Sequence, residues 1–283
     1  MVISILLTCH NRKNKTLRCL RSLKKQINPN EDDSYFIYLV DDGSTDGTTP
    51  AIYQEFPDVN IIQGAGNLYW YGGMQLAWEH ALKKKSDFFF WLNDDVILYK
   101  DALFTMIETY NSAKKKYGSA PVIGGNLCDP ITKKISYGGY TLEKGYSCFR
   151  THKIDPTGDI SQCDTINGNV VLIPKSVVNI VGTLDKKFTH AMGDFDYGLR
   201  CRDKGIPIAT TAGFIGECSN NPPENAWFSP NMPLLHRISK LNSPTGLPPR
   251  EYYYYIRKHT GILTGLVMQI KLYLRLFFPS LWR

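Results

Sequence analysis

Three short polar clusters contain residue types that could bind a metal ion or a nucleotide. Each follows a run of apolar residues, and together they are Thr8-Cys9-His10-Asn11, Asp41-Asp42-Gly43-Ser44 and Asn93-Asp94-Asp95. A hard divalent cation such as Mg²⁺ or Mn²⁺ takes few ligands from protein oxygens and the rest from phosphate and water. The third cluster could therefore hold such a cation on a diphosphate. Alternatively, one of its carboxylates caps the turn that follows.

The second cluster has two interpretations that its residue types leave open. An Asp at the end of a strand, such as Asp42, can accept hydrogen bonds from a nucleobase or a ribose hydroxyl, and Gly43 permits a tight turn. The same tetrapeptide is also typical of an ordinary Asx turn that caps the next helix.

A glycine-rich and aromatic segment, Gly66-Asn67-Leu68-Tyr69-Trp70-Tyr71-Gly72-Gly73, joins a predicted strand to a predicted helix. Its glycines would let backbone amides near the helix N-terminus approach an anion, and its aromatic rings could stack on a sugar or a base. The segment matches neither the dinucleotide-binding fingerprint nor the P-loop. We expect Gly66, Asn67, Trp70 and Gly73 to contact a sugar nucleotide.

Two further carboxylates, Asp194 and Asp196, lie at the start of a predicted helix over 194–204. An Asp at the start of a helix usually caps it. The other Asp could project into a cleft as a general base, a role that contributes roughly 10² to 10⁴ in rate.

The elements that position these residues follow from the alternation of apolar runs with amphipathic segments. The predicted strands are 2–8, 35–41, 60–63 and 87–92, and the predicted helices are 13–27, 48–55, 72–85 and 100–115. This pattern predicts an α/β fold with a mainly parallel sheet that helices cover on both faces. Ligands of such sheets bind beyond the carboxyl ends of the strands, where the three polar clusters are expected to meet. From about residue 121, shorter strands predict a smaller mixed sheet.

Composition excludes several classes of protein. The 283 residues are 43% hydrophobic and 21% charged, which is typical of a globular chain and not of a disordered one. The seven cysteines show no C-x-x-C spacing, which favours free thiols over a disulfide framework or a zinc finger. The N-terminal run is predicted to be a strand and not a signal peptide. We find no signature of nucleic-acid binding.

The net charge of +7 is concentrated near the C-terminus. Residues 231–283 contain eight Lys and Arg and one Glu, so the preceding 230 residues are balanced. The segment 219–250 is rich in Asn, Pro and Ser, which predicts a loop or flap. Within 251–283, the stretch 261–283 is apolar with a basic face, which favours a helix in a bilayer interface. The alternative is a C-terminal helix that docks on the core of the protein.

Taken in this order, the clusters resemble the family 2 glycosyltransferases of the GT-A fold, of the bacterial type that assembles polysaccharides. The matching features are Thr8-Cys9-His10-Asn11-Arg12, Asp41-Asp42-Gly43-Ser44, the Asn93-Asp94-Asp95 version of a D-x-D motif, and Asp194. The resemblance covers about residues 1–215, and 250–258 also looks like the tail of bacterial members. It implies a Rossmann-like GT-A domain over 1–218, with a nucleotide-sugar half (1–120) and an acceptor half (121–218).

The resemblance also implies roles for individual residues. Thr8 and Asp42 would hold the nucleotide base, and His10, Asn11 and Arg12 belong to the same nucleotide-binding motif. Asp95, with Asp94 beside it at the donor, would bind Mn²⁺ or Mg²⁺. Asp194 would remove a proton from the acceptor hydroxyl.

Three positions depart from the family pattern. The family often has Tyr in place of His10, Asp in place of Asn93 and Glu in place of Gly193. Asn93 could still bind a metal ion through its side-chain oxygen. Gly193 leaves Asp196 as an alternative base, although the resemblance favours Asp194.

The implied activity is an inverting, metal-dependent transfer from a UDP- or dTDP-sugar to a saccharide hydroxyl. The acceptor would be linked to a lipid diphosphate, in the synthesis of O-antigen or capsule, with the protein peripheral at the cytoplasmic face of the cell membrane. A sugar-1-phosphate nucleotidylyltransferase is an alternative, although its glycine-rich start is missing here. A catalytically inactive scaffold of the same fold is a second alternative.

Overall fold

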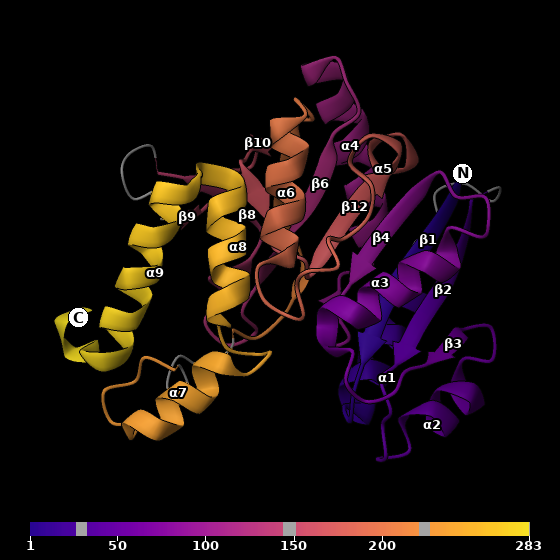
Figure 1. Cartoon of the computed structure of the whole chain (residues 1–283). Helices are drawn as coiled ribbons and strands as arrows, with labels where there is room; N and C mark the ends of the chain where they lie inside the picture. The colour runs from indigo at the N-terminus through magenta and orange to yellow at the C-terminus, as the bar shows by residue number, and fades with distance from the viewer. Residues whose placement is uncertain (27–32, 144–150, 221–226, 283) are drawn as a thin grey trace.

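A ten-stranded sheet forms the centre of the molecule (Figure 1). The computed structural model describes residues 1–26, 33–143, 151–220 and 227–282. The first half contains β1 (Val2–Cys9), α1 (Lys13–Lys24), β2 (Ser34–Asp41), α2 (Thr48–Glu55), β3 (Asn60–Gln63), α3 (Tyr69–Ala81), β4 (Phe88–Leu92), β5 (Ile97–Leu98) and α4 (Ala102–Tyr117). The second half contains β6 (Val122–Cys128), β7 (Ile135–Tyr137), β8 (Gly139–Leu142), β9 (Thr151–Lys153), β10 (Ser161–Gln162), β11 (Thr165–Ile166), β12 (Val170–Pro174), α5 (Lys175–Val181), α6 (Gly193–Asp203) and β13 (Ile208–Glu217). The C-terminal part contains α7 (Leu234–Asn242), α8 (Pro249–Thr260), α9 (Ile262–Phe277) and the short 3₁₀ helix η2 (Pro279–Trp282).

The main path through the sheet is β10-β13-β6-β12-β4-β1-β2-β3. Strand β1 pairs in parallel with β2 and β4, and β2 pairs in parallel with β3. Strand β12 is antiparallel to both β4 and β6, so β6 and β13 run in the same direction as the first four strands. The prediction of a mainly parallel α/β sheet is therefore confirmed. The smaller sheet, β11-β8-β9, is antiparallel and not mixed as predicted, because β9 and β11 both run opposite to β8.

Side chains that alternate along each central strand build two cores, one on each face of the sheet. From β1, Ile5 and Leu7 pack with α1 and α4, whereas Leu6 packs on the other face with α3, α5 and α6. The second core is rich in aromatic rings, among them Trp78 and Trp91, whose centroids lie 5.5 Å apart. Both faces are buried, which explains why the central strands read as continuous apolar runs.

Helix α3 begins at Tyr69, three residues earlier than the predicted start at 72. The reason is a carboxylate from a neighbouring strand end: the amides of Leu68 and Tyr69 donate to Asp42 at 2.8 and 3.1 Å. These are amide groups that a helix start leaves without a partner within the helix. No local sequence pattern indicates a contact between residues so far apart in the sequence.

The prediction of a loop over 219–250 is wrong for its central part, which forms α7. The buried Arg237 of α7 donates to the carbonyl oxygen of Leu276 in α9 at 2.7 Å, and Leu241 is buried beside Leu272. Contacts with α9 therefore stabilise a helix within a segment whose composition is typical of a loop.

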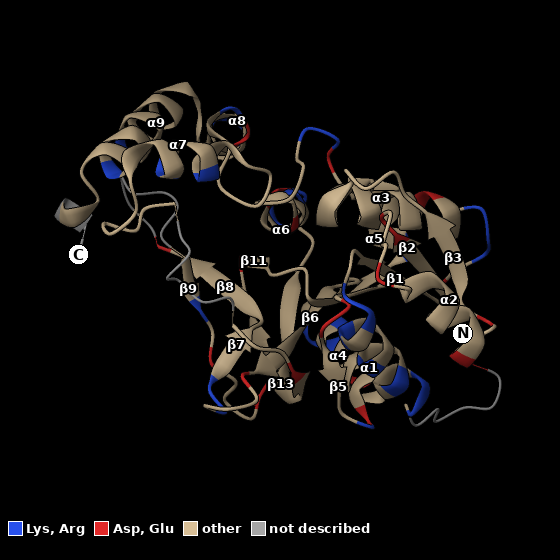
Figure 2. Ribbon diagram, turned by 90° about the horizontal axis from the view of Figure 1, so that it is seen from below, with Lys and Arg blue, Asp and Glu red and all other residues tan. Residues whose placement is uncertain are grey.

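The C-terminal helices pack together on one side of α6, opposite α3 (Figure 2). Helix α9 buries Gly265, Leu272 and Leu276 and leaves a second apolar face exposed. Within the described part of the chain, every helix is too short or too polar to span a membrane.

We expect Gly73→Ala to destabilise the protein, although alanine normally favours a helix interior by up to about 1 kcal/mol. A Cβ at Gly73 would overlap the Thr8 side chain, which holds α3 close to β1. Overpacking of this kind costs about 1–3 kcal/mol. Urea denaturation of this variant, with Gly213→Ala as the control because a Cβ there meets open space, checks this. Equal stability of the two variants would contradict the close packing.

Candidate active site

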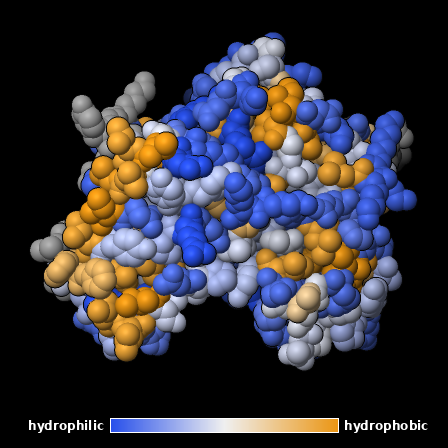
Figure 3. Space-filling view, in the orientation of Figure 1, coloured by the Kyte–Doolittle hydropathy of each residue, from blue (hydrophilic) through white to orange (hydrophobic). Residues whose placement is uncertain are grey.

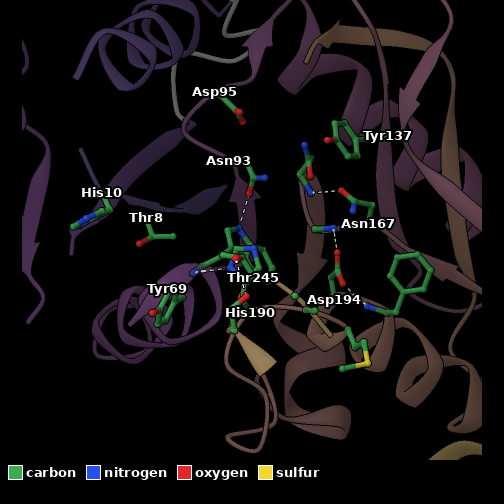
Figure 4. A pocket seen from close by; sticks show the side chains of 18 of the residues that line it. Thr8, His10, Tyr69, Asn93, Asp95, Tyr137, Asn167, His190, Asp194 and Thr245 are labelled. Atoms are coloured by element: carbon green, nitrogen blue, oxygen red, sulfur yellow. Dashed lines mark hydrogen bonds between the residues drawn. The ribbon is translucent and has the colours of Figure 1, made fainter. Parts of the chain in front are cut away.

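A cavity of about 1150 Å³ lies at the carboxyl ends of β1, β2 and β4 (Figure 4). It brings together residues from the separate polar clusters and from the start of α6. The predicted site residues that line it are Thr8, His10, Arg12, Asp42, Trp70, Asp94, Asp95 and Asp194. Asn11, Gly66, Asn67 and Gly73 are not among its lining residues. The expected convergence of the acidic clusters on one crevice is present.

Asp42 organises the loop that precedes α3. Its Oδ1 accepts a hydrogen bond from the Gly66 amide at 2.7 Å, while its Oδ2 accepts those of Leu68 and Tyr69. A Cβ at Gly64 would lie 2.6 Å from the same carboxylate, so a glycine is needed there. Asp42 thus fixes the backbone from which the aromatic side chains reach the cavity, and its contact with a nucleobase stays a prediction.

The neighbouring Asp41 shapes its own turn, as the alternative for this cluster predicted, but it does not cap the next helix, which begins at Thr48 after Gly47. Its Oδ1 accepts from the Ser44 amide at 2.9 Å, and its Oδ2 accepts from the Thr49 hydroxyl. The two consecutive carboxylates therefore have different roles: Asp41 shapes its own turn, and Asp42 binds the loop that precedes α3.

His10 and Asn11 tie the end of β1 to the end of β2. The His10 Nδ1 lies 2.6 Å from the carbonyl oxygen of Asp42. When Nδ1 carries the proton and donates it to this oxygen, Nε2 can accept a hydrogen bond from the side-chain amide of Asn11 at 3.1 Å. Asn11 has a φ of 50° and accepts the Thr45 amide at 2.8 Å. Asn11 therefore acts on the loops around the cavity, whereas the ring of His10 lines the cavity itself.

Trp70 connects the glycine-rich segment to the D-x-D motif. Its indole Nε1 donates to the Asn93 Oδ1 at 2.6 Å, and its ring leaves no room for a Cβ at Gly168. The side-chain oxygen of Asn93, which was a possible metal ligand, is thus engaged with the indole. The acidic character of the motif rests on Asp94 and Asp95.

Arg12 neutralises both carboxylates of that motif. It donates to Asp94 Oδ1 at 2.8 Å and to Asp95 Oδ2, and Thr16 adds a longer hydrogen bond to Asp94 at 3.3 Å. Burial raises the pKa of Asp94 to about 7, and the Arg12 charge opposes that rise. Lys15 lies 3.9 Å from Asp95, so two basic and two acidic side chains meet at this corner of the cavity.

The carboxylates of Asp94 and Asp95 fit a hard divalent cation. Asp95 is partly exposed to the cavity, and its Oδ1 meets the Cys218 thiol at 3.6 Å, a weak donor that a cation could replace. Across the described residues, no group of three or more His, Cys, Asp or Glu is arranged to hold a metal. A cation here would take its remaining ligands from phosphate and water, as Mg²⁺ commonly does.

The two acidic residues of α6 occupy different environments. Asp194 faces the cavity, and its oxygens accept the amides of Gly168 and Phe195, each at 2.8 Å. Burial raises the pKa of Asp194, which the two amides oppose. Asp196 is buried and binds Arg200, Lys258 and His259. This arrangement favours Asp194 as the residue available to an acceptor.

Gly193 also has a structural reason to differ from the Glu that the family often has. A Cβ at Gly193 would overlap the ring of Tyr71, which belongs to the aromatic segment of α3. The departure is therefore a packing consequence of Tyr71, and it leaves Asp194 at the cavity.

One wall of the cavity was not predicted from the sequence. Trp227, Thr245, Tyr252 and Tyr255 line it from the C-terminal part of the chain. His190 lines it as well, and its Nδ1 lies 3.4 Å from the Trp70 amide. The run of four tyrosines at 252–255 was the available signal, because two of these residues face the cavity.

We expect Arg12→Ala to lower the free energy of unfolding by about 1–2 kcal/mol, because it leaves the buried Asp94 without its counter-charge. Urea denaturation measures this, with Arg18→Ala as a control because Arg18 is exposed on the same helix. Similar stabilities of the two variants would show that Arg12 does not compensate the carboxylate pair.

Comparison with known proteins agrees with this geometry. No curated protein matches the chain. The crystal structure of S. aureus TarS 1–349 is similar in fold, with a TM-score of 0.54, 13% sequence identity and coverage of 94% of this chain and 71% of TarS. The family model for glycosyl transferase family 2 matches residues 4–146, just over half of the chain. The chain therefore belongs to glycosyl transferase family 2.

Proposed function

We propose that this protein is an inverting, metal-dependent glycosyltransferase that uses a UDP- or dTDP-sugar and a saccharide acceptor. One observation carries the proposal: Asp42, Asp95 and Asp194 line the same cavity, although they are far apart in sequence. Membership of family 2 supports the reaction class. The proposal is also supported by carboxylates at two parts of the cavity, at the strand ends and at the start of α6.

The donor binds on the side formed by β1, β2 and α3. Thr8 contacts the base, and the loop that Asp42 orders presents Trp70 to the sugar or the base. Arg12, which already binds carboxylates, also places positive charge near the diphosphate. Asp95, with Asp94 beside it, would hold Mn²⁺ or Mg²⁺. When bound, this ion offsets the negative charge that develops on the departing diphosphate.

Asp194 acts as the general base on the opposite side of the cavity (Figure 4). The acceptor oxygen attacks the anomeric carbon as the bond to the diphosphate breaks, and Asp194 takes the hydroxyl proton. Attack from the face opposite the leaving group inverts the anomeric centre. The raised pKa of Asp194 suits a base, because efficiency increases as the pKa approaches the working pH.

A sugar-1-phosphate nucleotidylyltransferase is less consistent with the chain. Its glycine-rich first loop is replaced here by Thr8-Cys9-His10-Asn11-Arg12. Incubation with a nucleotide sugar and an acceptor, compared with a sugar phosphate and a nucleoside triphosphate, separates the two enzymes by their products. An inactive scaffold would bind nucleotide without turnover under either condition.

We expect Asp194→Asn to lower sugar transfer about 10²- to 10⁴-fold while nucleotide binding is retained. The assay follows nucleotide release from a panel of UDP- and dTDP-sugars with Mn²⁺. In the wild type, kcat falls as the pH drops through the Asp194 pKa. Because burial raises that pKa, the fall occurs at a higher pH than for an ordinary carboxyl group. Full activity of Asp194→Asn would contradict the assignment of the base.

The exposed face of α9 supports a position at the membrane surface. Its apolar residues form one stripe, visible along the left edge of Figure 3, that consists of Leu263, Leu266, Val267, Ile270, Tyr273, Leu274 and Phe277. Helix α9 contains no acidic residue, and Lys271 is exposed beside the stripe. An apolar face flanked by positive charge suits an anionic bilayer. We propose that α9 brings the cavity to a lipid-diphosphate-linked acceptor of surface-polysaccharide (O-antigen or capsule) synthesis at the cytoplasmic face.

Fewer of the C-terminal basic residues are available to anionic lipid than the sequence indicates. Several of the C-terminal basic residues are engaged within the protein: Arg237 binds a carbonyl, Lys258 binds carboxylates, and Arg275 packs on the Phe228 ring at 3.8 Å. The apolar stripe therefore contributes most of the binding, and charge contributes less than the net +7 suggests.

We expect the double variant Leu263→Glu/Ile270→Glu to reduce binding to anionic liposomes at least tenfold, because it places two charges in the apolar face. A flotation assay measures this. The matched control is Ile131→Glu/Ile180→Glu, which changes two exposed isoleucines elsewhere on the surface. Equal flotation of the two variants would contradict the proposal. If the wild type is a dimer in solution and the Leu263→Glu/Ile270→Glu variant is a monomer that still floats with liposomes, the apolar face binds a second copy of the chain.

A further inference from the structure

Asp196 is the centre of a buried ionic cluster next to the proposed base. Its Oδ2 accepts from Arg200 Nε at 2.8 Å, and its Oδ1 accepts from Lys258 Nζ at 2.7 Å and from His259 Nε2 at 2.9 Å. Two of these donors belong to α8, which follows the catalytic domain by more than 30 residues of sequence. Although burial opposes its charged form, the hydrogen bonds from His259 and Lys258 lower the pKa of Asp196.

A second set of contacts joins α8 to the segment that leads into α6. Asp185 accepts from Lys258 Nζ and from the Tyr254 hydroxyl, each at 2.7 Å. Thr189 donates from its amide and its hydroxyl to Glu251 at 3.0 and 2.8 Å. Helix α8 therefore binds the segment Asp185–Asp196 at both ends and near its middle.

The segment held in this way forms part of the cavity. His190, Met192 and Asp194 all line it. Met192 has a φ of 68° and accepts the Asp196 amide at 2.8 Å, so the turn into α6 is a strained backbone conformation that needs support. A buried ionic cluster directly behind this turn supplies that support.

Helix α8 is also part of the aromatic core beneath the site. Tyr255 and Ile256 are buried in the core cluster that contains Trp78, Trp91 and Tyr197. The ring of Tyr255 lies 6.3 Å from that of Phe188, within the held segment. Figure 1 shows α8 next to α6, where Lys258 and His259 reach Asp196. The helix is therefore integrated with the acceptor half of the molecule.

We propose that Lys258 and His259 are positioning residues of the active site, which hold the Asp185–Asp196 segment through Asp185 and Asp196 so that Asp194 faces the acceptor. This inference rests on the proposed role of Asp194. Neither Lys258 nor His259 lines the cavity, so they act through the segment and not on the substrate. The catalytic unit accordingly includes α8, whereas the sequence placed its boundary at residue 218.

The test compares Lys258→Met with Lys258→Arg. Arginine keeps the positive charge and can donate hydrogen bonds to both Asp185 and Asp196. We expect Lys258→Met to lower kcat about 10- to 100-fold, because a displacement of about 1 Å at a catalytic group costs about that much. The donor KM should stay within about twofold, since the donor contacts come from β1, β2 and α3. Lys258→Arg should restore most of kcat. Lys186→Ala is the matched control, because Lys186 makes an exposed ion pair with Glu79.

Hydrogen exchange of the amides in 186–196 provides a readout that needs no turnover. We expect faster exchange there in folded Lys258→Met but not in Lys186→Ala. Unchanged exchange and kcat, or a donor KM that rises as much as kcat falls, would overturn the inference. If Lys258→Met does not fold, His259→Gln, which keeps a donor, and His259→Leu, which does not, replace the pair with the same expectations. Faster exchange of 186–196 in Lys258→Met, combined with a wild type that transfers no sugar, would overturn the proposed function and leave the positioning of this segment by Lys258 intact.

Discussion

The need to compensate buried carboxylates determines the arrangement of this site. A charged carboxylate inside a protein is stable only when hydrogen-bond donors or cations surround it. Asp42 obtains three backbone amides, Asp94 obtains Arg12, and Asp196 obtains three basic side chains. Asp194 accepts hydrogen bonds from the backbone amides of Gly168 and Phe195. The three basic side chains around Asp196 lower its pKa, whereas burial raises the pKa of Asp194, so Asp194 is the better proton acceptor of the two.

The same interactions connect parts of the chain that are distant in sequence. Asp42 crosses from β2 to the start of α3, and Trp70 in α3 crosses to the end of β4. Tyr71, the next residue, packs against Gly193 at the start of α6. One helical turn of α3 therefore touches both the donor side and the base side. A change in that turn would disturb both sides together, which gives the aromatic segment a role in aligning the two substrates.

Much of the first half was predictable from sequence because its signals are local. Strands β1, β2 and β4 are buried on both faces, so their apolar runs are continuous, and the polar clusters mark where they end. The convergence of Asp42 and Asp95 follows from the parallel direction of those strands. Asp194 was assigned by resemblance, and the structure adds the physical reason that its neighbour Asp196 is occupied by cations.

The features that the sequence did not reveal depend on contacts between distant segments. Helix α7 lies in a segment of loop-like composition and is stabilised by Arg237 and Leu241 against α9. The hydrogen bond from Trp70 engages the side-chain oxygen of Asn93, which was a possible metal ligand, and no local pattern encodes it. The basic residues of the C-terminus appeared free for lipid in the sequence, yet Lys258 binds two buried or half-buried carboxylates. In each case the partner is a residue more than 20 positions away.

We infer that Asp95, with Asp94 beside it, would hold a divalent cation on the diphosphate of a nucleotide bound in this cavity. Calorimetric titration of UDP and dTDP into the wild type and Asp95→Asn, each with and without Mn²⁺, tests it most directly. We expect the wild type to bind one of these nucleotides at least tenfold more tightly with Mn²⁺, and Asp95→Asn to lose this enhancement. Binding that is equally tight in all four conditions would contradict it.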